Sequence, residues 1–102
     1  MTQFLLQHVY VPDDVLMREL DGESVILDLA SEKYFGLDDI GTRMWQILED
    51  SDTVQEAYDI LLQEYDVDSQ QLLKDLQELV EQLVNSNLLI LESVNSPVRS
   101  AR

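Results

Sequence analysis

The sequence predicts an α+β protein with a winged helix-turn-helix fold, in which a three-stranded antiparallel sheet precedes three helices. In the first third, short runs of strand-forming residues flank Asp21-Gly22, a dipeptide that suits a tight hairpin turn because both residues tolerate positive φ. From residue 38 onward, apolar residues recur every three or four positions, as on one face of a helix. The last two predicted helices are joined by a short turn, which is typical of a helix-turn-helix unit.

Three short stretches have the composition and alternation of β-strands. They are Val15–Leu20, Glu23–Leu29 and Lys33–Leu37. In the second stretch alternate positions are apolar, so one face of the strand is strongly apolar. That face consists of Val25, Leu27 and Leu29, which alternate with Ser24, Ile26 and Asp28. A further strand at Gln7–Val11, ending at Pro12, has a weaker pattern.

Two amphipathic helices follow the predicted sheet. The first begins at an acidic N-cap, Asp38 or Asp39, whose carboxylate accepts hydrogen bonds from free N–H groups of the first turn. Its apolar face comprises Ile40, Met44, Ile47 and Leu48, with Trp45 beside them. The second begins at Thr53-Val54-Gln55-Glu56, which fits a capping box. Its apolar face comprises Val54, Ala57, Tyr58, Leu61, Leu62 and Tyr65.

A third helix is predicted from about Asp68 to Val84, and it carries two apolar stripes. The first stripe is Leu72, Leu76, Leu79 and Leu83, and the second, displaced by about a quarter turn, is Leu73, Val80 and Val84. One stripe is enough to seal a core, so the second is either deeply buried or left for another chain. Leu88–Leu91 then returns to the sheet or caps the core, and residues 93–102 form a flexible tail. Residues 1–92 therefore form a single domain.

Charge and hydropathy limit the partners of this chain. Its 102 residues carry a net charge of −15, with 21 acidic and six basic residues. Such a chain repels nucleic acids and anionic membrane surfaces, because both are bound largely through Lys and Arg. No stretch approaches the ~20 apolar residues of a membrane span, and Met1–Val11 lacks the basic start and cleavage site of a signal peptide. We expect a cytoplasmic protein that binds neither nucleic acid nor membranes; its acidity either keeps it soluble or attracts a cationic partner.

The sequence offers no catalytic or metal-binding constellation. Cysteine is absent and His8 is the single histidine, which excludes thiolate zinc sites, cysteine nucleophiles and His-based triads. Acidic pairs such as Asp13-Asp14 fall in predicted loops or at helix starts, where carboxylates cap helices or are solvated. Asp66-Val67-Asp68 lacks the Gly and the distant Glu of a calcium loop. We therefore expect no catalytic residue, no metal, no cofactor and no enzymatic activity.

The predicted third strand offers a binding function of another kind. If the strands follow the order of a meander, Lys33–Leu37 is an edge strand, to which an extended peptide can add a further strand. The alternative is that a loop or a second copy of the protein covers this edge. The fold also suggests DNA binding, but the third helix opposes contact with a major groove. It carries Asp68, Asp75, Glu78 and Glu81 against Lys74 alone.

The stretch from Glu23 to Trp45 resembles the PqqD family, named for pyrroloquinoline quinone biosynthesis. Its most specific part is Tyr34-Phe35-Gly36-Leu37-Asp38 followed by Gly41 and Trp45. The continuation through residues 53–68 and the leucine-rich third helix also fit, so the resemblance covers roughly Val9–Leu91. It implies a recognition domain for ribosomally made, later modified peptides, in which the leader of the precursor pairs with the third strand and lies against the third helix.

The resemblance also implies which residues bind the leader and which proteins are partners. The implied leader-binding residues are Lys33, Tyr34, Phe35, Gly36, Leu72, Leu73, Leu76, Gln77 and Val80. The domain would do no chemistry and would raise the concentration of the precursor near a modifying enzyme. The segment Gly41–Trp45 looks closest to members from lasso-peptide pathways, which implies a leader peptidase as the partner. A radical S-adenosylmethionine enzyme is the second choice, a winged-helix transcription regulator is the alternative of another class, and we expect a monomer or weak dimer.

Overall fold

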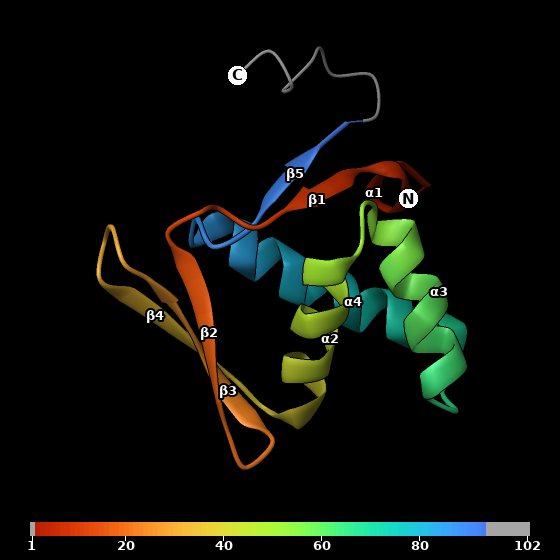
Figure 1. Cartoon of the computed structure of the whole chain (residues 1–102). Helices are drawn as coiled ribbons and strands as arrows, with labels where there is room; N and C mark the ends of the chain where they lie inside the picture. The colour runs from red at the N-terminus through yellow and green to blue at the C-terminus, as the bar shows by residue number, and fades with distance from the viewer. Residues whose placement is uncertain (1, 94–102) are drawn as a thin grey trace.

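The sheet and the helices follow the predicted order, with a short helix and two short strands added near the ends (Figure 1). The computed structural model describes residues 2–93. Its elements are α1 (Thr2–Leu6), β1 (His8–Tyr10), β2 (Val15–Leu20), β3 (Glu23–Asp28), β4 (Lys33–Leu37), α2 (Asp39–Asp50), α3 (Val54–Glu64), α4 (Ser69–Asn85) and β5 (Ile90–Glu92). The predicted α+β winged helix-turn-helix arrangement is confirmed. The flexible tail predicted for residues 93–102 lies, except for Ser93, outside the described residues.

The β2–β3 hairpin closes through the two-residue turn that the sequence predicts. Asp21 and Gly22 have φ values of 55° and 86°, and Leu20 pairs with Glu23 across the turn. Positive φ at both central residues is what a type I′ turn requires, and Gly and short polar residues meet this requirement at the lowest cost. The turn sets the register of β2 with β3, and β4 continues the sheet as an antiparallel third strand.

β3 directs toward the core the face opposite to its strongly apolar one. Its buried residues are Ser24, Ile26 and Asp28. Val25 and Leu29, on the strongly apolar face, are 41% and 56% exposed. The polar side chains can be buried because they have partners, and Ser24 Oγ lies 2.7 Å from Thr42 Oγ1 on α2. Alternation along a strand thus reports two faces but not which of them a helix covers.

Asp28 ends β3 and organises the loop that leads to β4. Its carboxylate accepts hydrogen bonds from the Ala30 N–H at 3.0 Å and from the Ser31 hydroxyl at 2.8 Å. The Ser31 hydroxyl lowers the pKa of Asp28, against the opposing effect of burial. Glu32, with φ of 66°, donates its N–H to the Asp28 carbonyl at 2.7 Å. The strand ends one residue earlier than predicted because these bonds turn the chain at Asp28.

Each long helix begins at a side-chain cap. The N-caps of α2, α3 and α4 are Asp38, Thr53 and Asp68. Each side-chain oxygen accepts a hydrogen bond from the N–H three residues later, at 2.7, 3.2 and 3.0 Å respectively. At α3 the Glu56 carboxylate accepts from the Asp52 N–H at 2.8 Å, one residue before the N–H that a standard capping box uses. The predicted helix starts are therefore confirmed, with Asp38 as the cap of α2.

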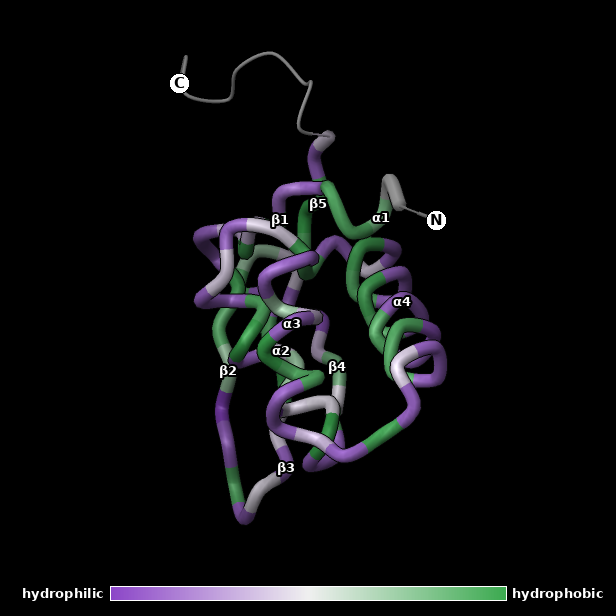
Figure 2. Tube along the Cα trace, turned by 90° about the vertical axis from the view of Figure 1, so that its right-hand side faces the viewer, coloured by the Kyte–Doolittle hydropathy of each residue, from purple (hydrophilic) through white to green (hydrophobic). Residues whose placement is uncertain are grey.

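The core lies between the sheet and the helices. Its largest fully buried side chains are Trp45, Ile26, Leu48, Leu61, Leu76, Leu83, Leu88, Leu89, Val54 and Val80. The buried stripe of α4 is Leu72, Leu76, Val80 and Leu83. Val80, predicted for the second stripe, thus belongs to the core, whereas Leu79, predicted for the first, is only partly buried beside it. Figure 2 shows α4 hydrophobic on the side toward the rest of the molecule and hydrophilic on the outer side.

The two ends of the described chain meet in a separate two-stranded sheet. β1 pairs antiparallel with β5, and Val9 lies opposite Leu91. The weak strand pattern at Gln7–Val11 therefore marks a real strand at His8–Tyr10. Leu88 and Leu89 cap the core with 1% exposure each, while Ile90–Glu92 pairs with β1 and not with the three-stranded sheet. Helix α1, which precedes β1, has no counterpart in the sequence prediction.

Candidate functional site

Among the described residues 2–93, β4 pairs on one side only, with β3, so the other edge of this strand is free. In an antiparallel pair, alternate residues direct their N–H and C=O groups toward the neighbouring strand. The Leu29 N–H donates to the Asp14 carbonyl at 2.9 Å, so the β3 positions that bond to β2 are 23, 25 and 27. Positions 24, 26 and 28 then bond to β4, at Leu37, Phe35 and Lys33. The backbone groups of Tyr34 and Gly36 therefore point out of the sheet, toward a strand that could be added.

A groove runs between this edge and α4. Its volume is about 440 Å³, and it is formed by β4, the start of α2 and one flank of α4. The lining residues are Phe35, Gly36, Leu37, Asp38, Ile40, Gly41, Met44, Asp75, Leu79 and Gln82. A Cβ atom at Gly41 would lie 3.2 Å from Asp38 Oδ1 and 3.2 Å from Leu37 Cδ2, so the wall is closely packed there. An extended chain lying in this groove would meet backbone groups on one side and apolar side chains on the other.

The groove continues past the end of β4 into a smaller pocket of about 90 Å³. Ile40, Met44 and Asp75 line both hollows, and the smaller one adds Tyr65, Val67, Gln71 and Leu72. Ile40, predicted for the apolar face of α2, is 48% exposed, and Val67 is 49% exposed. Both apolar side chains therefore present surface to this pocket.

The four strand residues predicted to bind a leader lie along the free edge. Tyr34 is 74% exposed, and its side chain lies on the outer face of the sheet. Phe35 is half-buried and lines the groove together with Gly36. Lys33 is exposed at the start of the strand, where its N–H donates to Ser31 Oγ at 3.3 Å. The structure brings Phe35 and Gly36 into the groove, whereas Tyr34 offers its backbone.

The five helix residues predicted to bind a leader lie in different environments, some in the core and some on the flank of α4 away from the groove. Leu76 and Val80 have no exposed surface and lie in the core, and Leu72, 4% exposed, borders the smaller pocket. Leu73 and Gln77 are half-buried and lie, at about 100° of rotation per residue, on the flank of α4 away from the groove. Leu76 and Val80 belong to the stripe that seals the core, so they are not among the residues that line the groove.

The groove flank of α4 consists of residues that the sequence interpretation did not choose. They are Asp75, Leu79 and Gln82. Their i, i+4, i+7 spacing places them on one side of the helix, but two of them are polar, so a search for apolar stripes passes over them. The exposure of Ile40 and Val67 was likewise hidden, because hydrophobic spacing does not report which apolar residues remain exposed.

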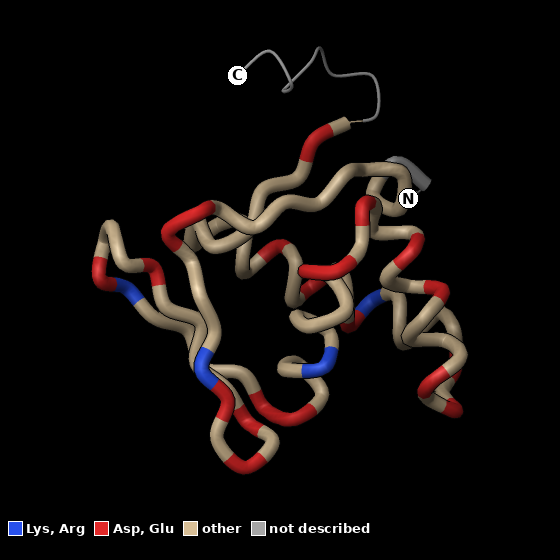
Figure 3. The backbone as a smooth tube through the Cα atoms, in the orientation of Figure 1, with Lys and Arg blue, Asp and Glu red and all other residues tan. Residues whose placement is uncertain are grey.

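The groove is acidic where β4 ends. Asp38 and Asp75 line it, and among residues 2–93 neither forms an ion pair with a Lys or Arg. Asp38 accepts the capping hydrogen bond of α2, while Asp75 Oδ1 accepts from the Gln71 side-chain amide at 2.9 Å. Figure 3 shows acidic residues on almost every element and few cations among them. The groove thus combines apolar surface with negative charge.

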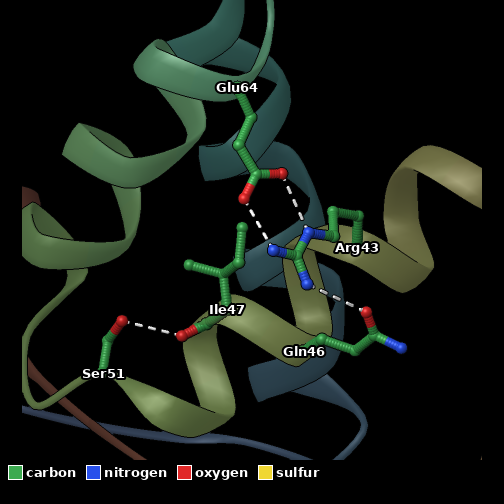
Figure 4. Close-up of polar contacts among 5 residues, drawn as sticks. All are labelled: Arg43, Gln46, Ile47, Ser51 and Glu64. Carbon is green, nitrogen blue, oxygen red and sulfur yellow. Dashed lines mark hydrogen bonds and ion pairs between the residues drawn. The ribbon is translucent and has the colours of Figure 1, made fainter.

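Arg43, near the start of α2, is engaged by Glu64 of α3 (Figure 4). Its Nε and Nη2 donate to the two oxygens of Glu64 at 2.9 and 2.6 Å, and its Nη1 donates to Gln46 Oε1 at 3.2 Å. The hydrogen bond to Glu64 raises the pKa of Arg43, and the same bond lowers the pKa of Glu64. This bidentate pair joins two helices. Because Arg43 is paired with Glu64, it does not neutralise the negative charge of Asp38 and Asp75 in the groove.

Within the described range, neither hollow is lined by a metal-binding cluster or by the carboxyl whose pKa is raised, Glu49. Within residues 2–93, no group of three or more His, Asp and Glu side chains could hold a metal ion. Burial raises the pKa of Glu49, but this residue lies on α2 and does not line either hollow. None of the helices in the described range is long and apolar enough to span a membrane. What the site offers is a strand edge, an apolar groove and carboxylates.

Comparisons with known proteins identify the family of this chain. The family model described as "Coenzyme PQQ synthesis protein D (PqqD)" matches residues 23–89. The structure of "TbiB1 in Complex with the TbiA(beta) Leader Peptide" has a TM-score of 0.71 and 36% identity, covering 78% of this chain and 93% of that chain. "Lasso peptide synthetase B1 complexed with the leader peptide" has a TM-score of 0.70 at 23% identity, covering 81% of this chain and 98% of that chain, and shows a common fold. No curated protein sequence gives a significant match.

Proposed function

Since the chain belongs to the PqqD family, we propose that it binds the leader of a ribosomally made precursor peptide and presents that peptide to a separate modifying enzyme. The observation that supports this most directly is the free edge of β4 beside the groove on α4. The TbiB1 relative was solved with a leader peptide bound, and it shares 36% of its sequence with this chain. Binding by strand addition needs an edge and a groove, and this molecule has both.

In strand addition the backbone and the side chains make different contributions to binding. The N–H and C=O groups of Tyr34 and Gly36 provide hydrogen bonds that any extended peptide can make. Side chains of the added strand alternate, so every second leader residue faces the groove beside Phe35 and Leu79. Affinity would come largely from the backbone, and selectivity from the residues that enter the groove.

The protein would act as an adaptor and leave the chemistry to its partner. Holding the leader raises the effective concentration of the precursor at the enzyme without any new reactive group. We propose a lasso-peptide leader peptidase as the enzyme, supported by the fold shared with lasso peptide synthetase B1. A radical S-adenosylmethionine enzyme is the alternative within the same adaptor role. Mixing the protein and a precursor with each enzyme, and following the precursor mass, separates the two.

The winged-helix fold makes a transcription regulator the competing function, and charge opposes it. On α4 the exposed acids Asp75, Glu78 and Glu81 outnumber the exposed Lys74. A recognition helix of this charge would be repelled by phosphates, since DNA affinity rises with each phosphate that a cation neutralises. We expect no binding of duplex DNA at moderate salt, measured by fluorescence anisotropy.

The edge of β4 gives a sharp test of the proposed function. Replacing Tyr34 with proline removes an N–H that points out of the sheet and leaves the β3–β4 hydrogen bonds in place. We expect Tyr34→Pro to bind a fluorescein-labelled TbiA(beta) leader about tenfold more weakly than the parent, or worse, because a backbone bond is lost and the ring obstructs the strand. Fluorescence anisotropy measures the affinity.

Tyr34→Ala is the matched control, because it keeps the N–H and removes a side chain on the outer face of the sheet. Its affinity should stay within about threefold of the parent, since little of that side chain faces the groove. Circular dichroism of both variants must show a folded protein. If folded Tyr34→Pro binds the leader as tightly as Tyr34→Ala does, the peptide does not add to β4 and the proposed site is wrong.

A further inference from the structure

The hollow beyond the end of β4 is bordered by exposed apolar side chains. Ile40 and Val67 approach it from α2 and from the loop between α3 and α4, and nearly half of each side chain is exposed. Its volume of about 90 Å³ suits one aliphatic side chain and not a second peptide strand. Exposed apolar side chains that gather around a hollow mark a binding surface. The hollow is also continuous with the groove beside β4, through Ile40 and Met44.

Asp75 is placed between the two hollows and lines both of them. Its one recorded partner is the neutral Gln71 amide, and within the described range 2–93 no cation pairs with it. It lies beyond the first turn of α4, so the positive end of the helix dipole does little to offset its charge. Because Asp75 is exposed, an ion pair formed there is partly screened by water and contributes modestly.

Asp38, the other carboxylate of the groove, is less available to a ligand. It caps α2 through the Gly41 N–H at 2.7 Å, and the free N–H groups of that helix start offset its charge. Replacing it would also weaken the helix start, whereas Asp75 caps nothing. Asp75 is therefore the carboxylate that a cationic side chain would meet.

Resting on the proposed function, we propose that the leader selected by this protein carries an apolar residue that fills the hollow at Ile40 and Val67, and a Lys or Arg that pairs with Asp75. An extended chain places residues i and i+2 on the same face, about 7 Å apart. The two side chains therefore stand two positions apart in the leader. This pairing selects leaders by charge as well as by hydrophobicity, in a protein whose overall charge of −15 already attracts cationic peptides.

The test is a selection from a displayed library of random 12-residue peptides on the purified full-length protein. Parallel selections use Asp75→Asn and Glu81→Gln, which change the net charge equally on the same helix. Glu81 is exposed and lines neither hollow, so it controls for general attraction of basic peptides. We expect peptides from the parent and from Glu81→Gln to carry Lys or Arg two positions from an aliphatic residue. Asp75→Asn should lose this pattern and bind the selected peptides about fivefold more weakly, the size of one partly shielded ion pair.

A second pair of variants tests the apolar half of the proposal. Val67→Ser should weaken binding of the same selected peptides about fivefold, because buried methyl groups are lost. Val25→Ser, at a valine of similar exposure on the outer face of the sheet, should leave binding unchanged. Equal effects of Asp75→Asn and Glu81→Gln, or of Val67→Ser and Val25→Ser, would overturn the inference. If the selected peptides bind Tyr34→Pro as well as the parent, the proposed function itself fails, whatever their charge.

Discussion

Ser24 and Thr42 join the sheet to the first long helix through a hydrogen bond that both residues bury. Their hydroxyl oxygens lie 2.7 Å apart, and the two residues are 5% and 3% exposed. A buried hydroxyl without a partner costs about 1–3 kcal/mol, so this pair permits a polar residue on the inner face of β3. The face that β3 turns inward thus depends on one contact between residues 18 positions apart, which alternation along the strand cannot report.

A double-mutant cycle tests the contribution of this pair. Ser24→Ala and Thr42→Val should each lower the free energy of unfolding by about 1–3 kcal/mol, because each leaves the other hydroxyl buried and unpaired. The double variant should lose less than the sum, with a coupling of about 1 kcal/mol. Urea denaturation measures all four proteins. Additivity within about 0.3 kcal/mol would show that the two hydroxyls do not act together.

Two apolar residues beside the groove have exposed surface that the sequence pattern does not show. Ile40 follows helical spacing and Val67 sits in a loop, and a pattern of hydrophobicity does not report that about half of each is exposed. Local rules of this kind are expected to fail at surfaces that bind a partner. The outward direction of the Tyr34 and Gly36 backbone groups was predictable, because it follows from strand order and register.

At the scale of elements, the Arg43–Glu64 pair ties α2 to α3 and makes their packing sensitive to pH (Figure 4). Arg43 lowers the pKa of Glu64, so the ionised form is favoured in the folded state. A carboxyl with a lowered folded pKa contributes stability above its unfolded pKa, about 4.3, and loses it as the pH falls through the folded value. The pair therefore stabilises the protein at neutral pH and not in acid.

Glu64→Gln should accordingly melt at a lower temperature than the parent at neutral pH. The difference should shrink as the pH falls below about 4.3 and vanish once Glu64 is protonated in both states. Glu81→Gln, with the same change in net charge and no ion pair within the described range, should show no such loss at neutral pH. Thermal melts followed by circular dichroism supply the comparison. A difference between Glu64→Gln and the parent that persists unchanged into acid would rule out the ion pair as its cause.

The order and bounds of most elements could be predicted, because their signals are local. The caps at Thr53 and Asp68 and the turn at Asp21-Gly22 each act within a few residues. The β1–β5 sheet could not be predicted, since it joins positions such as Val9 and Leu91 that share no local signal. The stripes of α4 were assigned wrongly for a related reason. Several apolar faces satisfy helical spacing, and the neighbouring elements decide which of them is buried.

At the scale of the whole molecule, negative charge works against compactness. A net charge of −15 is held in a fold whose Cα radius of gyration is 13.5 Å. At about 10 mM salt the Debye length is about 30 Å, so carboxylates across the whole molecule repel one another. Among residues 2–93 a single Arg–Glu ion pair opposes this repulsion. The same field that would attract a cationic peptide therefore lowers the stability of the free protein.

Salt should consequently stabilise this protein. Raising NaCl from about 10 mM to about 1 M shortens the Debye length from about 30 Å to about 3 Å, which screens the repulsion more than it weakens one partly exposed ion pair. We expect the melting temperature, followed by circular dichroism, to rise along this series. Glu81→Lys, which reduces the net charge to about −13, should melt higher than the parent at low salt and gain less from added salt. A melting temperature that falls with salt in the parent would mean that attractive ion pairs outweigh repulsion.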